Sequence, residues 1–235
     1  METEQATAKT FDPNCDPAKL ARIGAHVRNK LNANKHVLQV DVADLELYVY
    51  REFLNHADCA TMIRKIDAQA VPSTLYKGTE QPGFRTSFSC HMNRWDADVA
   101  RIETRISDVI GIHNDYAETM QGQRYAVGQE FKAHHDFFHT SEHYWQQEAN
   151  AGGQRSWTAM IFLNIPDEGG ETEFHRVGIG IRPEVGTLLM WNNAKPDGSL
   201  NYKSLHAGTP VKAGMKHIIT KWFRQNNWTE LTRGK

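Results

Sequence analysis

The stretch HAGTPVKAGMKHIITKWFR, residues 206–224, decides the fold expected for this chain. Pro210 and Gly214 favour turns, so the chain is expected to double back before Lys216. From Lys216 onward, the run KHIITKWFR has the composition of a strand. Successive strand side chains alternate between faces, so every second residue is expected on one face: Lys216, Ile218, Thr220, Trp222 and Arg224. One strand face would therefore carry both a cation and a large aromatic ring.

Short β-prone runs also fill the chain upstream of this stretch, from Gln121 onward. Gly, Pro, Asn and Asp separate them, as between the strands of a sandwich or barrel. The runs are RYAVGQEF (124–131), WTAMIFLNI (157–165), ETEF (171–174) and TLLMW (187–191).

Helices are expected in the first half of the chain. Asp16 and Pro17 predict the start of a helix that runs to about Leu31, and Asn55 predicts the cap of a second one. Apolar residues at helical spacing mark the second helix and a third: Cys59, Met62, Ile63 and Ile66, then Val99, Ile102, Ile106 and Ile110. A strand is expected over 45–54, and a mobile loop with a short strand over 73–90. Helices first and strands later indicate an α+β fold that is mainly β.

The length of 235 residues suits one catalytic domain over 45–235, preceded by a tail and helix over 1–44. The 27 basic and 28 acidic residues leave a net charge of -1, which predicts no nucleic-acid partner. No apolar run is long enough for a membrane span, and the start resembles no secretory signal, so a cytoplasmic protein is expected. Cys15, Cys59 and Cys90 lack paired spacing and are expected to be reduced thiols. The sequence leaves open whether the protein forms a homodimer.

A metal site is predicted at His134 and Asp136, which would project to the same side of one strand while His135 points away. His206 is the natural third ligand. Two imidazoles and one carboxylate form the facial triad of non-heme iron(II) oxygenases. Two alternatives stay open from the residues alone: a zinc site, because zinc accepts the same ligands, or a polar exposed loop. His139 and His143, nearby, are expected to belong to such a loop.

Lys216 is the residue that discriminates among these alternatives. It lies ten positions after His206, and 2-oxoglutarate that chelates iron needs a buried cation for its distal carboxylate. A lysine inside a barrel indicates an anionic partner, because an unpaired buried charge is costly. The alternative is a solvated strand end.

The chain resembles the catalytic domain of prolyl 4-hydroxylases over about Leu45 to Arg224. Five segments carry the resemblance in the order of that family: RYAVGQEFKAHHDFF, GGQRSWTAMIFLN, EGGETEF, VGTLLMW and DGSLNYKSLHAGTPVKAGMKHIITKWFR. The resemblance implies a double-stranded β-helix (jelly roll) with supporting N-terminal helices. It also implies hydroxylation of proline in a peptide or protein, coupled to decarboxylation of 2-oxoglutarate to succinate. Iron(II), 2-oxoglutarate and dioxygen would be required, with ascorbate as the reductant.

Carried onto this sequence, the resemblance makes His134, Asp136 and His206 the iron ligands. Lys216 would bind the distal carboxylate of 2-oxoglutarate, and Tyr125 and Thr172 would line its pocket. The alternative for Tyr125 is an aromatic residue of the core. The alternative for Thr172 is a strand residue whose hydroxyl is satisfied by a hydrogen bond.

The resemblance further implies a peptide groove, lined by Arg85, Ser87, Glu118, Arg155 and Trp222. Surface ion pairs are the alternative for the charged residues, and core packing for Trp222. Two positions depart from the family pattern: Phe131 stands where tyrosine is frequent, and His135 where an aromatic residue is common. Phe131 lacks a hydroxyl that could contact the substrate, so these two positions bear on substrate identity.

Two other functions remain compatible with the sequence. One is hydroxylation of a free amino acid or another small metabolite on the same scaffold, which a closed pocket beside Trp222 would favour. The other is a non-catalytic metal-binding barrel.

Overall fold

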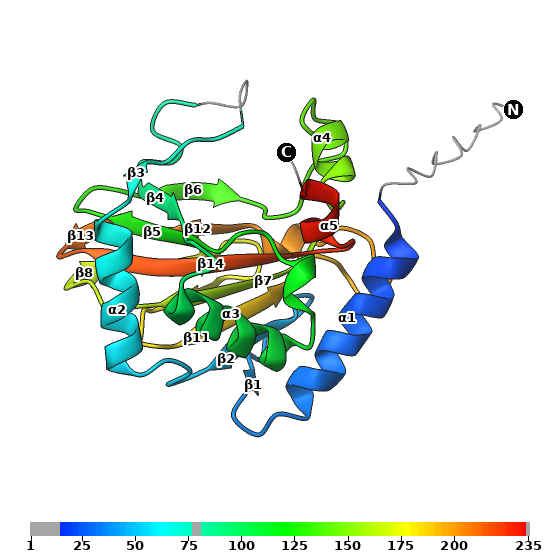
Figure 1. Cartoon of the computed structure of the whole chain (residues 1–235), viewed down its shortest axis with the longest axis horizontal. Helices are drawn as coiled ribbons and strands as arrows, with labels where there is room; N and C mark the ends of the chain where they lie inside the picture. Colours follow the sequence, from blue (N-terminus) through cyan, green and yellow to red (C-terminus); the bar gives the residue numbers. More distant parts are fainter. Residues whose placement is uncertain (1–14, 77–80, 234–235) are drawn as a thin grey trace, which may run out of the picture.

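Three helices form the outer layer of the protein, which a computed structural model describes over residues 15–76 and 81–233 (Figure 1). They are α1 (Pro17–Asn32), α2 (His56–Asp67) and α3 (Ala97–Ile110). Asp16, Asn55 and Asp96 cap them, each side-chain oxygen accepting a hydrogen bond from a backbone N–H of the first turn. The three predicted helices are therefore confirmed. Shorter helical elements are α4 (Trp145–Asn150), α5 (Trp228–Thr232), η1 (Asn114–Tyr116) and η2 (Tyr202–Ser204).

An eight-stranded antiparallel sheet forms the middle layer, in the order β1-β2-β11-β7-β14-β5-β4-β3. Its long central strands are β7 (Arg155–Phe162) and β14 (Lys216–Arg224), and β14 begins at the predicted residue. The other members are β1 (Leu38–Gln39), β2 (Leu47–Tyr50), β3 (Val71–Pro72), β4 (Phe88–His91), β5 (Gln121–Tyr125) and β11 (Leu188–Asn192).

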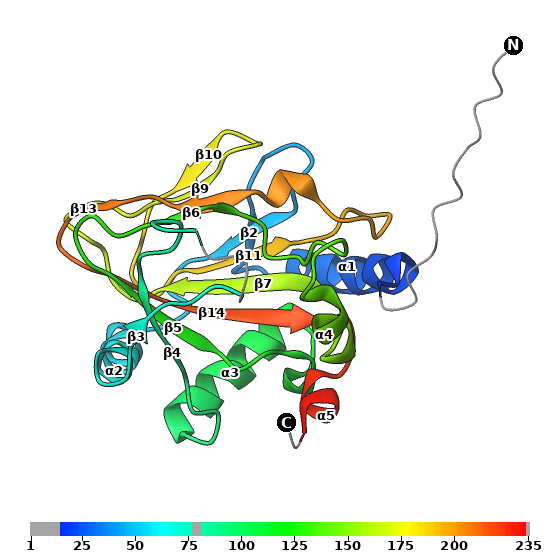
Figure 2. The ribbon, with the colours of Figure 1, turned by 90° about the horizontal axis from the view of Figure 1, so that it is seen from above.

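A four-stranded sheet in the order β10-β9-β12-β6 forms the third layer (Figure 2). It contains β6 (Phe131–His134), β9 (Thr172–Phe174), β10 (Ile179–Ile181) and β12 (His206–Gly208). At one end, β8 (Glu168–Gly169) pairs with β13 (Val211–Ala213). Strands thus dominate the fold and helices cover one side, in agreement with an α+β, mainly β protein.

The two faces of the eight-stranded sheet bury two different cores. On β7, Trp157, Ala159 and Ile161 join the core beneath the helices. Met160 and Phe162 face the smaller sheet and join the core between the sheets. The same alternation on β14 sends Ile219 and Phe223 toward the helices and Ile218 toward the smaller sheet. Side chains on the inner face of both strands therefore point into the space where a site can form.

Two strand predictions are corrected by the structure. The strand expected over 45–54 is limited to Leu47–Tyr50, because the chain turns at Glu52, whose φ is 56°. The run 124–131 is divided between β5 and β6 by a turn that contains Gly128 with φ 81°. Within the expected loop, 77–80 lie outside the described residues.

Cys59 is 1% exposed, as expected for a core residue, and the three cysteines form no disulfide. Among the helices described, none has the length and apolar character needed to cross a membrane.

Candidate active site

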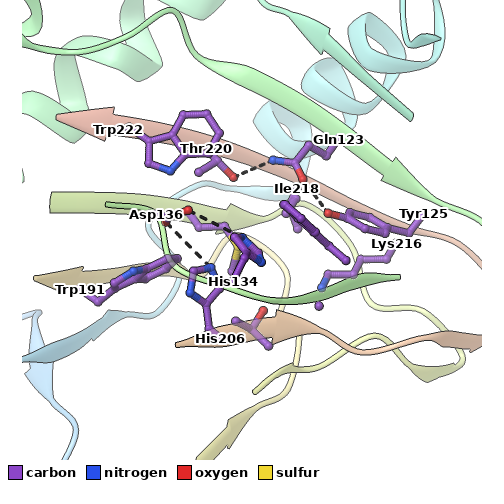
Figure 3. Close-up of a pocket in the computed structure, with 14 residues that line it drawn as sticks. Gln123, Tyr125, His134, Asp136, Trp191, His206, Lys216, Ile218, Thr220 and Trp222 are labelled. Carbon is purple, nitrogen blue, oxygen red and sulfur yellow. Dashed lines mark hydrogen bonds and ion pairs between the residues drawn. The ribbon is translucent and has the colours of Figure 1, made fainter. Parts of the chain in front are cut away.

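Three side chains that can bind a metal converge between the two sheets (Figure 3). One ligand atom each from His134, Asp136 and His206 lies within 4.8 Å of the others. The Nε2 atoms of His134 and His206 lie 3.7 and 3.9 Å from the two carboxylate oxygens of Asp136. It is the only such group of three or more His, Cys, Asp or Glu in the described part of the chain.

Pairing of β6 with β12 brings the two histidines together, since His134 and His206 are register partners. Both imidazoles are oriented in the same way: Nδ1 of each lies 2.8 or 2.9 Å from the carbonyl oxygen two residues earlier in the chain. This contact assigns the proton to Nδ1 and leaves the Nε2 lone pair directed at the cluster. Asp136 follows the end of β6 and is 4% exposed.

The Asp136 carboxylate is held by a short relay that the sequence did not predict. Thr158 on β7 donates a hydrogen bond to Oδ2 of Asp136 at 2.7 Å, and Asn193 donates to the Thr158 hydroxyl at 2.9 Å. Both donors are buried. A ligating carboxylate commonly needs such outer hydrogen bonds to keep its orientation.

The protonation states of the cluster suit a divalent cation. Burial lowers the pKa of His134 to about 3, and the neighbouring His206 adds to that effect. Burial by itself would raise the pKa of Asp136, but His206, His134 and Arg155 outweigh it and lower that pKa. Neutral imidazole and ionised carboxylate are the forms that bind metals, so these residues fit an iron(II) facial triad.

A pocket between the sheets adjoins the triad, and Lys216 lies on its wall. Lys216 is 2% exposed, and burial lowers its pKa to about 7, against a smaller opposing effect of Glu171. Its Nζ lies 5.4 and 5.6 Å from the ring centroids of Tyr125 and Phe162. Within the described residues Lys216 forms no salt bridge. A buried ammonium without a carboxylate partner fits the distal carboxylate of 2-oxoglutarate.

Tyr125 and Thr172 also line this pocket. The Thr172 hydroxyl is buried and finds no hydrogen-bond partner among the residues that the structure describes, as expected for a group that meets a ligand. The Tyr125 hydroxyl donates to Gln123 at 2.6 Å, and the Gln123 amide donates to Thr220 at 3.1 Å (Figure 3). Sequence reasoning missed Gln123, although it lies two residues before Tyr125 on the same strand face.

A groove of about 450 Å³ lies on the other side of the triad. Four of the predicted groove residues line it: Arg85, Glu118, Arg155 and Trp222. Ser87 does not line it; it is 1% exposed and lies behind Arg85, whose Nε is 3.3 Å from the Ser87 hydroxyl. Aromatic rings contribute much of the remaining wall, Phe131, Phe137 and Phe138 among them.

Glu118 and Arg155 form a partly buried ion pair in the groove, each with 15% of its side chain exposed, whereas Arg85 forms no ion pair with any described residue. Arg155 donates two hydrogen bonds to Glu118, at 2.6 and 2.7 Å, and Arg224 donates a third at 2.9 Å. Burial alone would raise the pKa of Glu118, but Arg155 and Arg224 lower it to about 2. The guanidinium of Arg155 lies 4.2 Å from the ring of Trp222 and 4.7 Å from that of Phe138. Trp222 therefore faces the groove and is not a core residue.

Comparisons with known proteins identify the family. Residues 120–224 match the model of the 2OG-Fe(II) oxygenase superfamily. The chain is 31% identical over 205 residues to the probable prolyl 4-hydroxylase 8 of Arabidopsis thaliana, which covers 77% of this chain and 69% of that protein.

Two solved structures have a similar fold. The viral collagen prolyl hydroxylase of Paramecium Bursaria Chlorella virus-1, in complex with 2-oxoglutarate, superposes with a TM-score of 0.59 at 25% identity, over 83% of this chain and 98% of that chain. The prolyl hydroxylase of Trichoplax adhaerens, in complex with a peptide of hypoxia inducible factor, superposes with a TM-score of 0.55 at 16% identity, over 92% and 94%. The chain belongs to the prolyl 4-hydroxylase family, and it is an iron(II)- and 2-oxoglutarate-dependent dioxygenase.

Proposed function

We propose that this enzyme hydroxylates proline within a peptide or protein and converts 2-oxoglutarate to succinate and CO2 in the same reaction. One observation carries the proposal: His134 and Asp136 line both the pocket that contains Lys216 and the aromatic groove. The three metal-binding side chains therefore lie between the pocket for an anionic cosubstrate and the groove for an extended substrate. Such an arrangement serves a reaction in which both molecules meet at one metal.

His134, Asp136 and His206 would hold iron(II) in this proposal, and Thr158 would keep the Asp136 carboxylate in position. When bound together with 2-oxoglutarate and dioxygen, iron(II) supplies the oxidising chemistry that places a hydroxyl group on an unactivated carbon. Lys216 and Thr172 would bind the distal carboxylate of 2-oxoglutarate through charge and a hydrogen bond. Ascorbate would serve as the reductant that keeps the iron ferrous.

The peptide would be bound by the groove residues. Glu118 holds the guanidinium of Arg155 against the ring of Trp222. The stacked guanidinium and ring form a flat, charged surface beside His134 and Asp136. Arg85 lies 4.8 Å from the Phe131 ring centroid and donates to Gln121 at 2.7 Å, without a carboxylate partner among the described residues. Its guanidinium therefore suits the carbonyl groups of a peptide backbone. Closure of this surface over the peptide would exclude water from the reacting centre.

We also propose that the two facing sheets form the double-stranded β-helix (jelly roll) of this family. The antiparallel pairing of β12 with both β6 and β9, opposite β7 and β14, supports this assignment. In that arrangement the metal cluster lies inside the core between the sheets and not at an exposed edge.

A groove of about 450 Å³ beside Trp222 favours a peptide substrate. A closed pocket at this position would instead suit a free amino acid. The experiment is incubation of the enzyme with iron(II), ascorbate, 2-oxoglutarate and either proline-containing peptides or free proline, with mass measurement of both. Oxygen gain by a peptide supports the proposal, whereas gain by the free amino acid alone contradicts it. Succinate formation by the wild type but not by Lys216→Ala excludes a non-catalytic metal barrel.

A further inference from the structure

Four rings form a compact cluster beside the metal-binding residues: His135, Phe137, His139 and Tyr202. His135 and Phe137 stack in parallel, with ring centroids 4.4 Å apart and an interplanar angle of 26°. Tyr202 meets both rings edge-on at 5.4 and 5.3 Å, and His139 meets both edge-on at 5.6 and 5.1 Å. These are favourable aromatic geometries, so the rings hold one another in place.

This ring cluster is continuous with the substrate groove. His135 and Phe137 line the groove directly, next to His134 and Asp136. Tyr202 extends the same aromatic surface outward and is 49% exposed. Tyr202 belongs to η2, far along the chain from His135, Phe137 and His139. The four rings nevertheless form a single surface that leads away from the triad.

We propose that the ring cluster is a second peptide subsite, which binds a prolyl residue that flanks the target proline on an extended substrate. The inference rests on the proposed peptide hydroxylation. Aromatic-lined surfaces bind extended proline-rich segments well, because the polyproline II conformation is already ordered and presents prolyl rings to aromatic faces. Continuity with the groove places this surface where the flank of a bound peptide emerges.

A purely structural role makes a different prediction. His135 Nε2 lies 3.3 Å from the backbone carbonyl of Tyr202, and η2 leads directly to His206. If the ring cluster only joined these two segments, loss of the Tyr202 ring would loosen the metal cluster. Iron affinity and the KM for 2-oxoglutarate would then change, whatever the length of the peptide. A subsite instead changes the preference for long peptides.

The test compares poly-L-proline of about twelve residues with poly-L-proline of about four, since at about 3.1 Å per residue the longer chain leaves several prolyl residues on both sides of the reacting one, wherever along the chain it reacts. The quantity measured is kcat/KM per proline for each length, with the KM for 2-oxoglutarate as a second readout. The variants are Tyr202→Ala and Tyr202→Phe. Tyr50→Ala is the matched control, because Tyr50 also stacks on a histidine, His36, but lies on β2 in the other sheet.

We expect Tyr202→Ala to lower the preference for the long peptide by about three- to tenfold, and Tyr202→Phe and Tyr50→Ala to preserve it. Three outcomes overturn the subsite: no length preference in the wild type, an unchanged preference in Tyr202→Ala, or an equal loss for both lengths together with a raised KM for 2-oxoglutarate. If the wild type hydroxylates neither peptide but does hydroxylate free proline, the proposed function fails and the subsite with it. Should Tyr202→Ala not fold, His139→Ala provides the same comparison from the other edge of the cluster.

Discussion

Glu118 and Arg155 form a two-pronged ion pair at the wall of the groove, with N–O distances of 2.6 and 2.7 Å. Arg155 also lies close to the metal cluster, since its Nη1 is 3.4 Å from the backbone carbonyl of Asp136. Arg224 completes the network, because its guanidinium donates to Glu118 and to Glu148. The orientation of Arg155 is thus set by the partly buried carboxylate of Glu118, which the buried Arg224 and Glu148 hold in place.

Arg155→Lys is expected to raise the KM for the peptide about tenfold or more. Lysine keeps the charge but loses the planar fork that fits the Glu118 carboxylate and stacks on Trp222. The KM for 2-oxoglutarate should stay within about twofold, because Lys216 provides that site. Steady-state kinetics with each substrate varied in turn measures both constants. Arg51→Lys, in an exposed pair with Glu184, is the control; an equal rise in both KM values would contradict the assignment.

A fully buried ion pair between Lys221 and Glu103 joins β14 to α3. Their side chains are 0% and 1% exposed, and the N–O distance is 2.6 Å. Lys221 also donates to the backbone carbonyl of Glu118 at 3.1 Å. Glu103→Ala should lower the free energy of unfolding by about 3–5 kcal/mol, because it leaves Lys221 buried without its partner. Urea unfolding measures the loss.

The double variant Glu103→Leu with Lys221→Met is the control for this pair. It removes both charges and replaces them with apolar side chains, so its loss should be clearly smaller than that of Glu103→Ala. A single variant that loses less than about 1 kcal/mol would show that Lys221 finds another partner or water.

Thr158→Val is expected to weaken iron(II) binding about tenfold while the fold is retained. Valine has nearly the shape of threonine but cannot donate the hydrogen bond that orients Asp136. The measurement is anaerobic titration of the protein with iron(II). Thr187→Val is the control, since Thr187 is also buried but lies just before β11 and lines neither the pocket nor the groove. Unchanged iron affinity in Thr158→Val would mean that Asp136 needs no such support.

The affinity for 2-oxoglutarate should fall as pH rises above about 7. The pKa of Lys216 is lowered to about 7 by burial, so the ammonium loses its proton above that pH. A bound carboxylate favours the charged form, hence binding takes up a proton, and the KM for 2-oxoglutarate should rise up to about tenfold per pH unit. Lys216→Arg keeps its charge throughout and should show a flatter profile. A wild-type KM that is constant from about pH 6 to 9 would contradict a role for Lys216 in this equilibrium.

Local patterns in the sequence predict a large part of this structure. The two-residue period places Lys216, Thr220 and Trp222 on one face of β14, and all three line the cavity between the sheets. Capping residues and helical spacing locate α1, α2 and α3. These features depend on neighbours within a few positions, which is the range over which such patterns act.

Contacts between distant segments could not be predicted in the same way. The partners Lys221 and Glu103 are 118 positions apart, and Thr158 meets Asp136 only because β7 lies opposite the end of β6. Strand alternation predicted that His135 points away from the site, but β6 ends at His134, and His135 lines the groove together with His134 and Asp136. Register and the ends of strands result from tertiary packing, which a single sequence does not display.

The most direct test of the central claim uses heavy-isotope dioxygen. A proline-containing peptide is incubated with the enzyme, iron(II), ascorbate and 2-oxoglutarate, then fragmented in a mass spectrometer while succinate is quantified. We predict one heavy oxygen atom on a proline for each succinate formed, and neither product with Lys216→Ala. Succinate formed without any oxygen on the peptide, together with oxygen gained by free proline, would contradict a peptide prolyl hydroxylase.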